Sequence, residues 1–176
     1  KKEIEQSDIV GGDETGVKVN GSKWWFWTWQ NTRNTFITAS DNRAYQTIEQ
    51  HFPNGFKKAH LVSDCYSAHL KTPALSHQLC TSHLIRDLNY LIELTGSPKA
   101  VRMKLLLMDA LHLKRKIPDP AYNLPYGERS FIRKELDRLL ASDMQGEHKK
   151  VRTFFKRLNK NRAHIIEFLY HAHVPP

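Results

Sequence analysis

The chain has 176 residues, 40% of them hydrophobic, and a formal net charge of +9, which suits a globular protein with one core or a core with an inserted subdomain. No apolar run approaches the roughly 18 residues of a membrane span, and two cysteines are too few for a secreted disulfide scaffold, so we expect a cytoplasmic protein without a membrane partner. Residues 1–98 carry equal numbers of acidic and basic side chains, and residues 99–176 carry all the excess positive charge, which fits either a polyanion partner such as DNA or a solvated helical surface.

The first elements are predicted to be three antiparallel strands. Polar and apolar residues alternate over Asp13–Val19, and Asn20-Gly21 is a strong two-residue hairpin turn. The aromatic run over residues 22–30 follows, and we interpret it as a strand buried on both faces. Residues 34–39 form the third strand of this meander.

The next segments alternate between helices and strands. They are a helix over 43–51, strands over 57–64 and 74–80, and a helix over 81–94 that Gly96-Ser97-Pro98 closes. Ser40 or Asp41 can cap the first of these helices. The order β-β-β-α-β-α-β-α, with a helix also between the fourth and fifth strands, predicts a mixed five-stranded sheet with flanking helices, in which the first, fourth and fifth strands run parallel.

From Lys99 onward every apolar pattern is helical. The predicted helices cover 99–116, 128–142 and 147–172, the last with a break near Asn159–Asn161, and a Pro-rich loop over 118–127 follows a stop at Ile117-Pro118. We therefore expect two parts, a mixed-sheet core over residues 1–98 and a basic helical insertion over residues 99–176.

Two carboxylates are placed where an open sheet binds ligands. Asp64 ends the fourth strand, and Asp13 lies in the first strand, its predicted parallel neighbour. A converging carboxylate pair prefers Mg²⁺ or Mn²⁺, and two such ions can promote phosphodiester cleavage. From spacing alone, Asp64 can equally be a helix cap or turn residue. Glu14 points to the opposite face from Asp13 and is expected to be a supporting or surface residue.

Four motifs in series carry a family resemblance. They are "DET" at Asp13–Thr15 before a Trp-rich strand, "VSDCYSAH" around Asp64, "QLCTSHLIRDL" at Gln78–Leu88, and the terminal "FLYHAHVPP". In order and spacing the chain resembles the insertion-sequence 66 family of DDE transposases. The resemblance implies a ribonuclease-H-like fold with a helical insertion after the fifth strand, and a bacterial, nucleoid-associated enzyme that cuts and joins DNA with divalent metal.

The resemblance also implies site residues. Asp13 and Asp64 match the family's first two catalytic and metal-binding aspartates. Its third acid is a glutamate that follows the "VPP" motif, at which this sequence stops, so we expect a fragment that is inactive by itself. The resemblance implies transposon ends and target DNA as partners, and a homo-oligomer assembled on that DNA.

Cys80, His83 and Arg86 match the family's C-x-x-H-x-x-R segment. His83 is predicted in the first turn of its helix, where it can contact a phosphate or the scissile strand as a catalytic residue, or be a structural hydrogen-bonding residue. Cys65, His69, Cys80 and His83 have spacings that a zinc site also permits. The resemblance and the acid pair favour Mg²⁺ or Mn²⁺ over zinc.

The aromatic and basic side chains leave further alternatives open. Trp24, Trp25, Trp27 and Trp29 can stack on bases, but their mixed parity favours core packing. Without a base-reading motif, any DNA contact of the basic side chains should be independent of sequence. The candidates for phosphate contact are Arg86, Arg133, Lys149, Lys150, Arg152, Lys156, Arg157 and Lys160. The alternatives to a transposase core are a non-catalytic DNA-binding or regulatory module and a structure-selective nuclease on the same fold.

Overall fold

The computed structural model describes residues 1–116 and 126–176. These residues form two compact units, Lys1–Gln78 and Leu79–Pro176. The division falls before helix α4 (Thr81–Thr95), whereas the sequence predicts a boundary after it. A mixed-sheet core over residues 1–98 with a helical insertion over residues 99–176 therefore stays a prediction.

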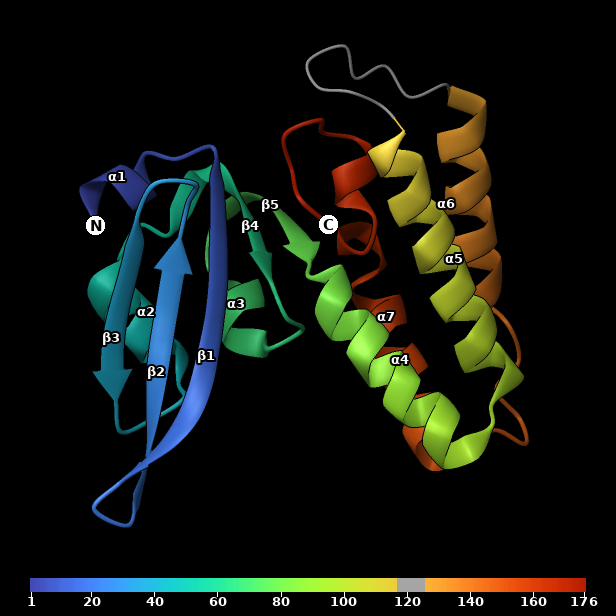
Figure 1. Cartoon of the computed structure of the whole chain (residues 1–176), viewed down its shortest axis with the longest axis horizontal. Coiled ribbons are helices and arrows are strands. Elements are labelled where there is room, and N and C mark those ends of the chain that lie inside the picture. Colours follow the sequence, from blue (N-terminus) through green and yellow to red (C-terminus); the bar gives the residue numbers. More distant parts are fainter. Residues whose placement is uncertain (117–125) are drawn as a thin grey trace. The chain divides into compact units, whose positions relative to one another are not determined.

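A mixed five-stranded sheet organises the first part of the chain. Its strands are β1 (Ile9–Val19), β2 (Ser22–Gln30), β3 (Thr35–Ser40), β4 (Phe56–Ser63) and β5 (Ala74–Leu79), in the spatial order β3-β2-β1-β4-β5. The β1–β2 and β2–β3 pairs are antiparallel, and β1 runs parallel to β4 (Figure 1). The helices α1 (Lys2–Glu5), α2 (Tyr45–His51) and α3 (Ser67–Lys71) complete the unit.

This strand order confirms the predicted fold class. A hairpin, a third strand and a helix separate the parallel strands β1 and β4, as a ribonuclease-H-like sheet requires, and every described element after β5 is helical. The hairpin turn is also confirmed, because Asn20 and Gly21 both have positive φ, 49° and 80°. The helix between β4 and β5, present in the predicted order, is α3, whereas the short helix α1 was not predicted.

Strand β2 is buried on one face, not on both as the sequence suggests. Trp27 and Trp29 are fully buried, whereas Phe26, which precedes Trp27 and points to the other face, is 44% exposed. The two buried indoles stack with ring centroids 5.8 Å apart, and Phe52 meets Trp29 edge-on at 5.0 Å. The prediction failed because this antiparallel sheet segment is covered on one side, where α2 and α3 lie (Figure 1).

Helix α2 starts without the predicted cap. Neither Ser40 nor Asp41 caps it; the N-cap is Ala44, which has no side chain to accept a bond. Instead Asn42 Oδ1 accepts from the backbone N–H of Ala44 at 3.0 Å and from Thr47 Oγ1 at 3.1 Å. The preceding loop therefore stabilises this end of α2, and it also carries Arg43 toward the core side of the sheet.

The second unit consists of helices. They are α4 (Thr81–Thr95), α5 (Pro98–Arg115), α6 (Tyr126–Leu140) and α7 (Lys149–Lys160), with short 3₁₀ turns η1 (Arg162–His164) and η2 (Glu167–Leu169). Gly96 ends α4 in the left-handed conformation, and Ser97 caps α5 by accepting from Ala100 N at 3.3 Å. The predicted break near Asn161 is confirmed. The predicted stop at Ile117-Pro118 and most of the Pro-rich loop lie outside the described residues.

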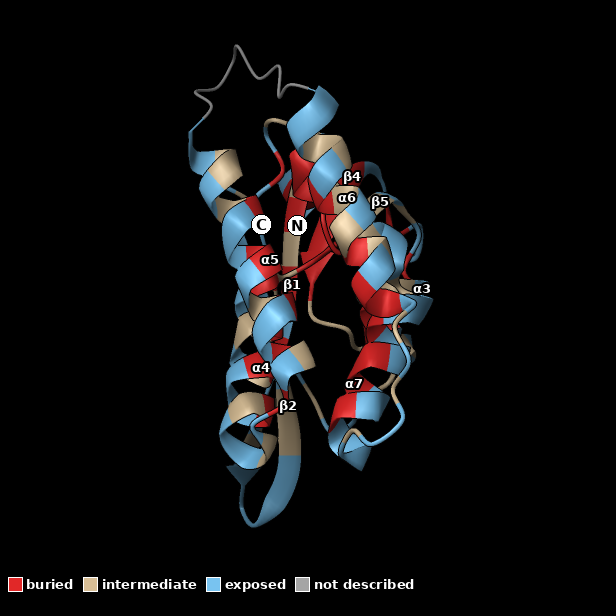
Figure 2. Cartoon of the chain, turned by 90° about the vertical axis from the view of Figure 1, so that its right-hand side faces the viewer, coloured by how far each residue is buried: buried red, intermediate tan, exposed pale blue. Residues whose placement is uncertain are grey.

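Each of these helices buries one side. On α7 the buried residues are Val151, Phe154, Phe155 and Leu158, and all six of its basic side chains are exposed (Figure 2). Within the described parts of the chain, no helix is both long enough and apolar enough to cross a bilayer.

A lysine anchors the last residues of the second unit. Lys114, in the last turn of α5, donates from Nζ to the backbone oxygens of Phe168, His171 and Ala172 at 3.0, 2.9 and 2.7 Å. An ammonium group has three donors, and all three are used here. These bonds hold the irregular segment after η2 against α5.

Candidate active site

Asp13 lies in the middle of β1, on the exposed face of the sheet. It pairs with Thr28 of β2, and its side chain is exposed, with Oδ1 accepting from the backbone N–H of Glu14 at 3.0 Å. Its neighbour Glu14 pairs with the buried Trp27 and points to the core face. The predicted opposition of Asp13 and Glu14 is confirmed, and the suggestion that Glu14 is a surface residue is wrong.

Asp64 directly follows the last residue of β4. The parallel register pairs Gly11 with Val62, so Asp13 and Asp64 each stand two residues further along adjacent strands, at the same level of the sheet. Asp64 Oδ1 accepts from the backbone N–H of Tyr66 at 2.8 Å, so the residue makes the turn contact considered for it. Its side chain keeps 24% of its surface exposed.

Behind the sheet, a buried network surrounds Glu14. Arg43 Nε donates to Glu14 Oε1 at 2.6 Å, and a terminal guanidinium nitrogen contacts the same oxygen. His69 Nε2 lies 2.6 Å from the other oxygen, Oε2, and neither the His69 nor the Glu14 side chain has exposed surface. Both carboxylate oxygens of Glu14 are thus engaged, and the charge is neutralised inside the core.

The network sets the ionisation of Glu14. Burial by itself would raise the pKa of this carboxyl, but the hydrogen bonds and charges of His69 and Arg43 together outweigh burial and lower the pKa below its ordinary value. Glu14 is therefore held as a carboxylate at neutral pH.

Two aromatic rings hold Arg43 in this network, and a glycine leaves room for His69. The guanidinium of Arg43 lies over the rings of Trp25 and Tyr66, 4.7 and 4.0 Å from their centroids, and the Tyr66 hydroxyl donates to the backbone oxygen of Arg43. Gly12 gives His69 its space, because a Cβ there would lie 3.3 Å from the imidazole. The two rings thus hold Arg43 beside Glu14 and Asp64, and Gly12 allows His69 to reach Glu14.

Asp64 belongs to the edge of the same network. Ligand atoms of Glu14, Asp64 and His69 all lie within 4.8 Å of one another, which is close enough for one metal ion. However, Arg43 already supplies positive charge there, since its guanidinium bonds Glu14 and lies 3.9 Å from Asp64 Oδ2. A metal at these three residues would have to displace an arginine that two aromatic rings hold in place.

The predicted residues of the C-x-x-H-x-x-R segment fall in the second unit. His83 lies in the first turn of α4, as expected, and is half-buried, while Arg86 is exposed on the same helix. Among the described residues no disulfide joins Cys65 and Cys80, and His69, one of the two histidines of the possible zinc set, is bound to Glu14. A catalytic role for His83 stays a prediction, as does zinc binding.

The candidates for DNA contact on α6 and α7 divide into three groups. Arg133 is bonded within the second unit: its guanidinium donates to the Tyr170 hydroxyl and to the Arg162 backbone oxygen, both at 3.3 Å. Lys150 and Arg157 reach from α7 to α4. The other side chains on α7 that were predicted to contact phosphate are exposed; they are Lys149, Arg152, Lys156 and Lys160.

Sequence reasoning missed Arg43 and the role of Glu14. The contact between Arg43 and Glu14 spans 29 positions of the chain, and that between His69 and Glu14 spans 55. Neither pairing has a local sequence signal. The one available hint was the parity of Glu14, which puts a charged side chain on the apolar face of β1.

The strand order and connections define the ribonuclease-H-like class of α/β protein. The model of the Transposase IS66 family matches residues 1–176, and the chain belongs to this family. Among solved structures it is similar to the HTLV-2 integrase catalytic core domain in complex with magnesium (trimeric form), at 20% identity, with 64% of this chain and 89% of that chain covered and a TM-score of 0.34. The comparison with curated proteins gives no match.

Proposed function

We propose that this chain provides two of the acids of a DNA transposase active site, which cuts a strand at a transposon end and joins the new 3′ hydroxyl to target DNA. The observation that carries the proposal is the parallel register of β1 and β4, which sets Asp13 and Asp64 level on neighbouring strands. Membership of the Transposase IS66 family supports the same reaction class.

Asp13 and Asp64 are the proposed metal ligands. Both offer carboxylate oxygens, the donors that Mg²⁺ and Mn²⁺ prefer, and both have exposed surface that a hydrated ion can reach. When bound, such ions activate the attacking oxygen and stabilise the leaving oxygen of the phosphodiester. Asp64 lies at a strand end, where its carboxylate accepts from Tyr66 N at 2.8 Å and stands 3.9 Å from Arg43.

Glu14 is proposed to support this pair without binding metal. Its side chain has no exposed surface, and both its oxygens are taken by Arg43 and His69. By holding Arg43, Glu14 fixes a positive charge beside Asp64. The residue next to the first metal ligand therefore organises the core side of the site.

The surroundings of the reaction also follow from this proposal. The exposed lysines and arginines of α7 bind phosphates without reading sequence, because they carry no base-specific pattern. His83 and Arg86 are proposed to contact the scissile strand, and the glutamate after the "VPP" motif to complete the metal site. Assembly on paired DNA ends and a place at the bacterial nucleoid belong to the same proposal.

One observation favours a second candidate. Asp64 is already bound by Tyr66 and neighboured by Arg43, which is what a structural acid would look like. On this reading the chain is a non-catalytic DNA-binding or regulatory module. A structure-selective nuclease on the same sheet would share the metal site but would not perform strand transfer.

The experiment compares matched variants of the full-length transposase on supercoiled DNA that carries the transposon ends. We expect Asp13→Asn and Asp64→Asn to abolish Mg²⁺-dependent nicking and strand transfer, and Asp41→Asn, at an exposed acid before α2, to leave both intact. Nicking that survives in Asp64→Asn would overturn the proposal in favour of the binding module. Nicking without strand transfer in the unmodified protein would favour the nuclease. Titration of Mn²⁺ into the 176-residue chain measures what two acids bind alone.

A further inference from the structure

A pocket of about 520 Å³ lies between α4 and α7, within the second unit. Its size falls in the range of roughly 300–1,000 Å³ that small-molecule sites occupy. We propose that this pocket binds unpaired nucleotides of a single DNA strand, with a base against Tyr90 and phosphates at Lys149 and Lys150. The inference deepens the proposed function, on which it rests, by naming the form of DNA that the helical unit takes.

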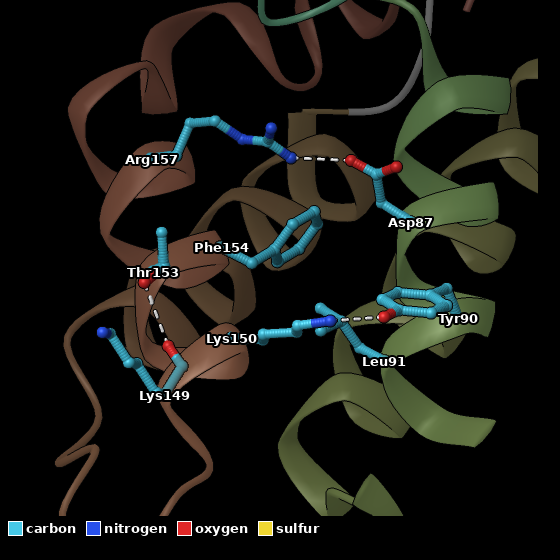
Figure 3. Close-up of a pocket in the computed structure, with 8 residues that line it drawn as sticks. All are labelled: Asp87, Tyr90, Leu91, Lys149, Lys150, Thr153, Phe154 and Arg157. Carbon is cyan, nitrogen blue, oxygen red and sulfur yellow. Dashed lines mark hydrogen bonds and ion pairs between the residues drawn. The ribbon is translucent and has the colours of Figure 1, made fainter. Parts of the chain in front are cut away.

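The pocket has an aromatic and apolar floor. Tyr90 of α4 is 50% exposed, on a helix that buries Leu84, Leu88 and Leu91. Leu91 and Phe154 line the pocket beside it (Figure 3). Every base has a flat face that stacks on such a ring, and this interaction does not depend on sequence.

The rim of the pocket is strongly positive. Lys149, Lys150 and Arg157 line it against one acid, Asp87, and Arg157 neutralises that acid through an ion pair of 2.7 Å. Two lysines thus remain in excess on one side of the pocket. A row of cations beside a stacking ring is the arrangement with which proteins hold single-stranded nucleic acid.

Two contacts between the helices preset the pocket. Lys150 Nζ donates to the Tyr90 hydroxyl at 2.5 Å and lies 4.9 Å from the ring centroid, while Arg157 reaches Asp87, one turn before Tyr90 on α4 (Figure 3). A phosphate bound by Lys150 would draw the ammonium group away from the hydroxyl. That movement would release the Tyr90 ring to meet a base, so backbone and base binding would occur together.

The pocket discriminates between single and double strands by access. In a duplex the bases are stacked on one another, and none can reach a ring inside a pocket without being extruded from the helix. A single strand presents its bases at no such cost. Duplex DNA can still bind the exposed lysines of α7 through its phosphates alone, with no contribution from Tyr90.

The test measures binding of the 176-residue chain to a short single strand that contains 2-aminopurine, whose fluorescence falls when it stacks, and to a duplex of equal length, both in EDTA. We expect Tyr90→Ala to weaken single-strand binding about 5- to 150-fold and to abolish the fluorescence change, because one stacking contact is lost. Tyr90→Phe keeps the ring and should retain both. Duplex affinity should not change in either variant.

A second arm tests the cations. Lys149→Ala should lower the slope of log affinity against log salt by about 0.7 for the single strand, one phosphate contact. Lys134→Ala, which removes an exposed charge from α6 outside the pocket, is its matched control, and Tyr126→Ala is the control for an exposed ring. The inference is overturned if Tyr90→Ala binds the single strand like Tyr126→Ala, or if Lys149→Ala and Lys134→Ala have equal slopes.

This outcome is separable from that of the proposed function. Binding is measured in EDTA and needs no catalysis. An unchanged affinity in Tyr90→Ala would therefore contradict the proposed single-strand site without contradicting the proposed metal-dependent reaction. Conversely, nicking that survives in Asp64→Asn would contradict the proposed catalytic role of Asp64. The binding measurement would still test the single-strand site.

Discussion

His69 Nε2 lies 2.6 Å from Glu14 Oε2 in a place where neither side chain has exposed surface. Together with Arg43, this pair brings charged groups into the core directly behind Asp13. Removing one partner of a buried pair is strongly destabilising, since the other is left without compensation. The contact therefore predicts that neutralising Glu14 lowers the stability of the fold strongly, whereas neutralising its neighbour Asp13 hardly changes it.

The first prediction compares Glu14→Gln with Asp13→Asn. We expect Glu14→Gln to lower the free energy of unfolding by roughly 3 kcal/mol, the low end of the range for a broken buried pair, because glutamine keeps some hydrogen bonding. Asp13→Asn, at an exposed position, should change it by no more than about 0.5 kcal/mol. Urea denaturation followed by tryptophan fluorescence measures both, and equal effects would contradict the assigned faces of β1.

The second prediction concerns pH. Because the pKa of Glu14 is lower in the folded chain than its unfolded value of about 4.3, its carboxylate contributes stability that is complete above the unfolded pKa and is lost as pH falls through the folded pKa. The difference in unfolding free energy between the unmodified chain and Glu14→Gln should thus be constant near neutrality and shrink below about pH 4. A difference that stays constant under acid conditions would show that the network does not lower this pKa.

The third prediction tests the space that His69 needs. Gly12→Ala would put a Cβ 3.3 Å from two atoms of the imidazole, so the ring must move by a few tenths of an ångström, at a cost of about 1–3 kcal/mol. Gly16→Ala, on the same strand at an exposed position, meets only ordinary contacts and is the control. Thermal unfolding should separate the two, and identical melting temperatures would mean that His69 is not confined.

The fourth prediction concerns the anchor in the second unit. Lys114→Met keeps the length of the side chain but removes its three bonds to backbone oxygens, which should cost on the order of 2–3 kcal/mol. The loss should show first as faster amide exchange after η2. Lys134→Met removes an exposed charge from α6 and serves as the control. Unchanged exchange in Lys114→Met would show that apolar packing alone holds the segment.

Sequence signals were reliable for turns and helix junctions, whose conformation depends on neighbouring residues. Asn20-Gly21 predicted the hairpin because few other residues accept positive φ at both positions, and Gly96-Ser97-Pro98 predicted the junction of α4 and α5 for similar reasons. The prediction for β2 was wrong because an aromatic run does not reveal whether a second layer covers the sheet. Ser40 and Asp41 failed as caps because a neighbouring asparagine took the same donors.

The sequence by itself determined the order of the five strands and of the helices that follow β3, the ribonuclease-H-like connections and the position of Asp64 at a strand end, since these follow from periodicity and turn chemistry. Its motifs also identified the transposase family, which the family comparison confirms. Only the tertiary structure decided that Glu14 is buried between Arg43 and His69 and that Tyr90 stands among the cations of α7. Those contacts join residues 29 to 60 positions apart, and no local propensity encodes such a distance; it emerges only when the sheet and the helices pack.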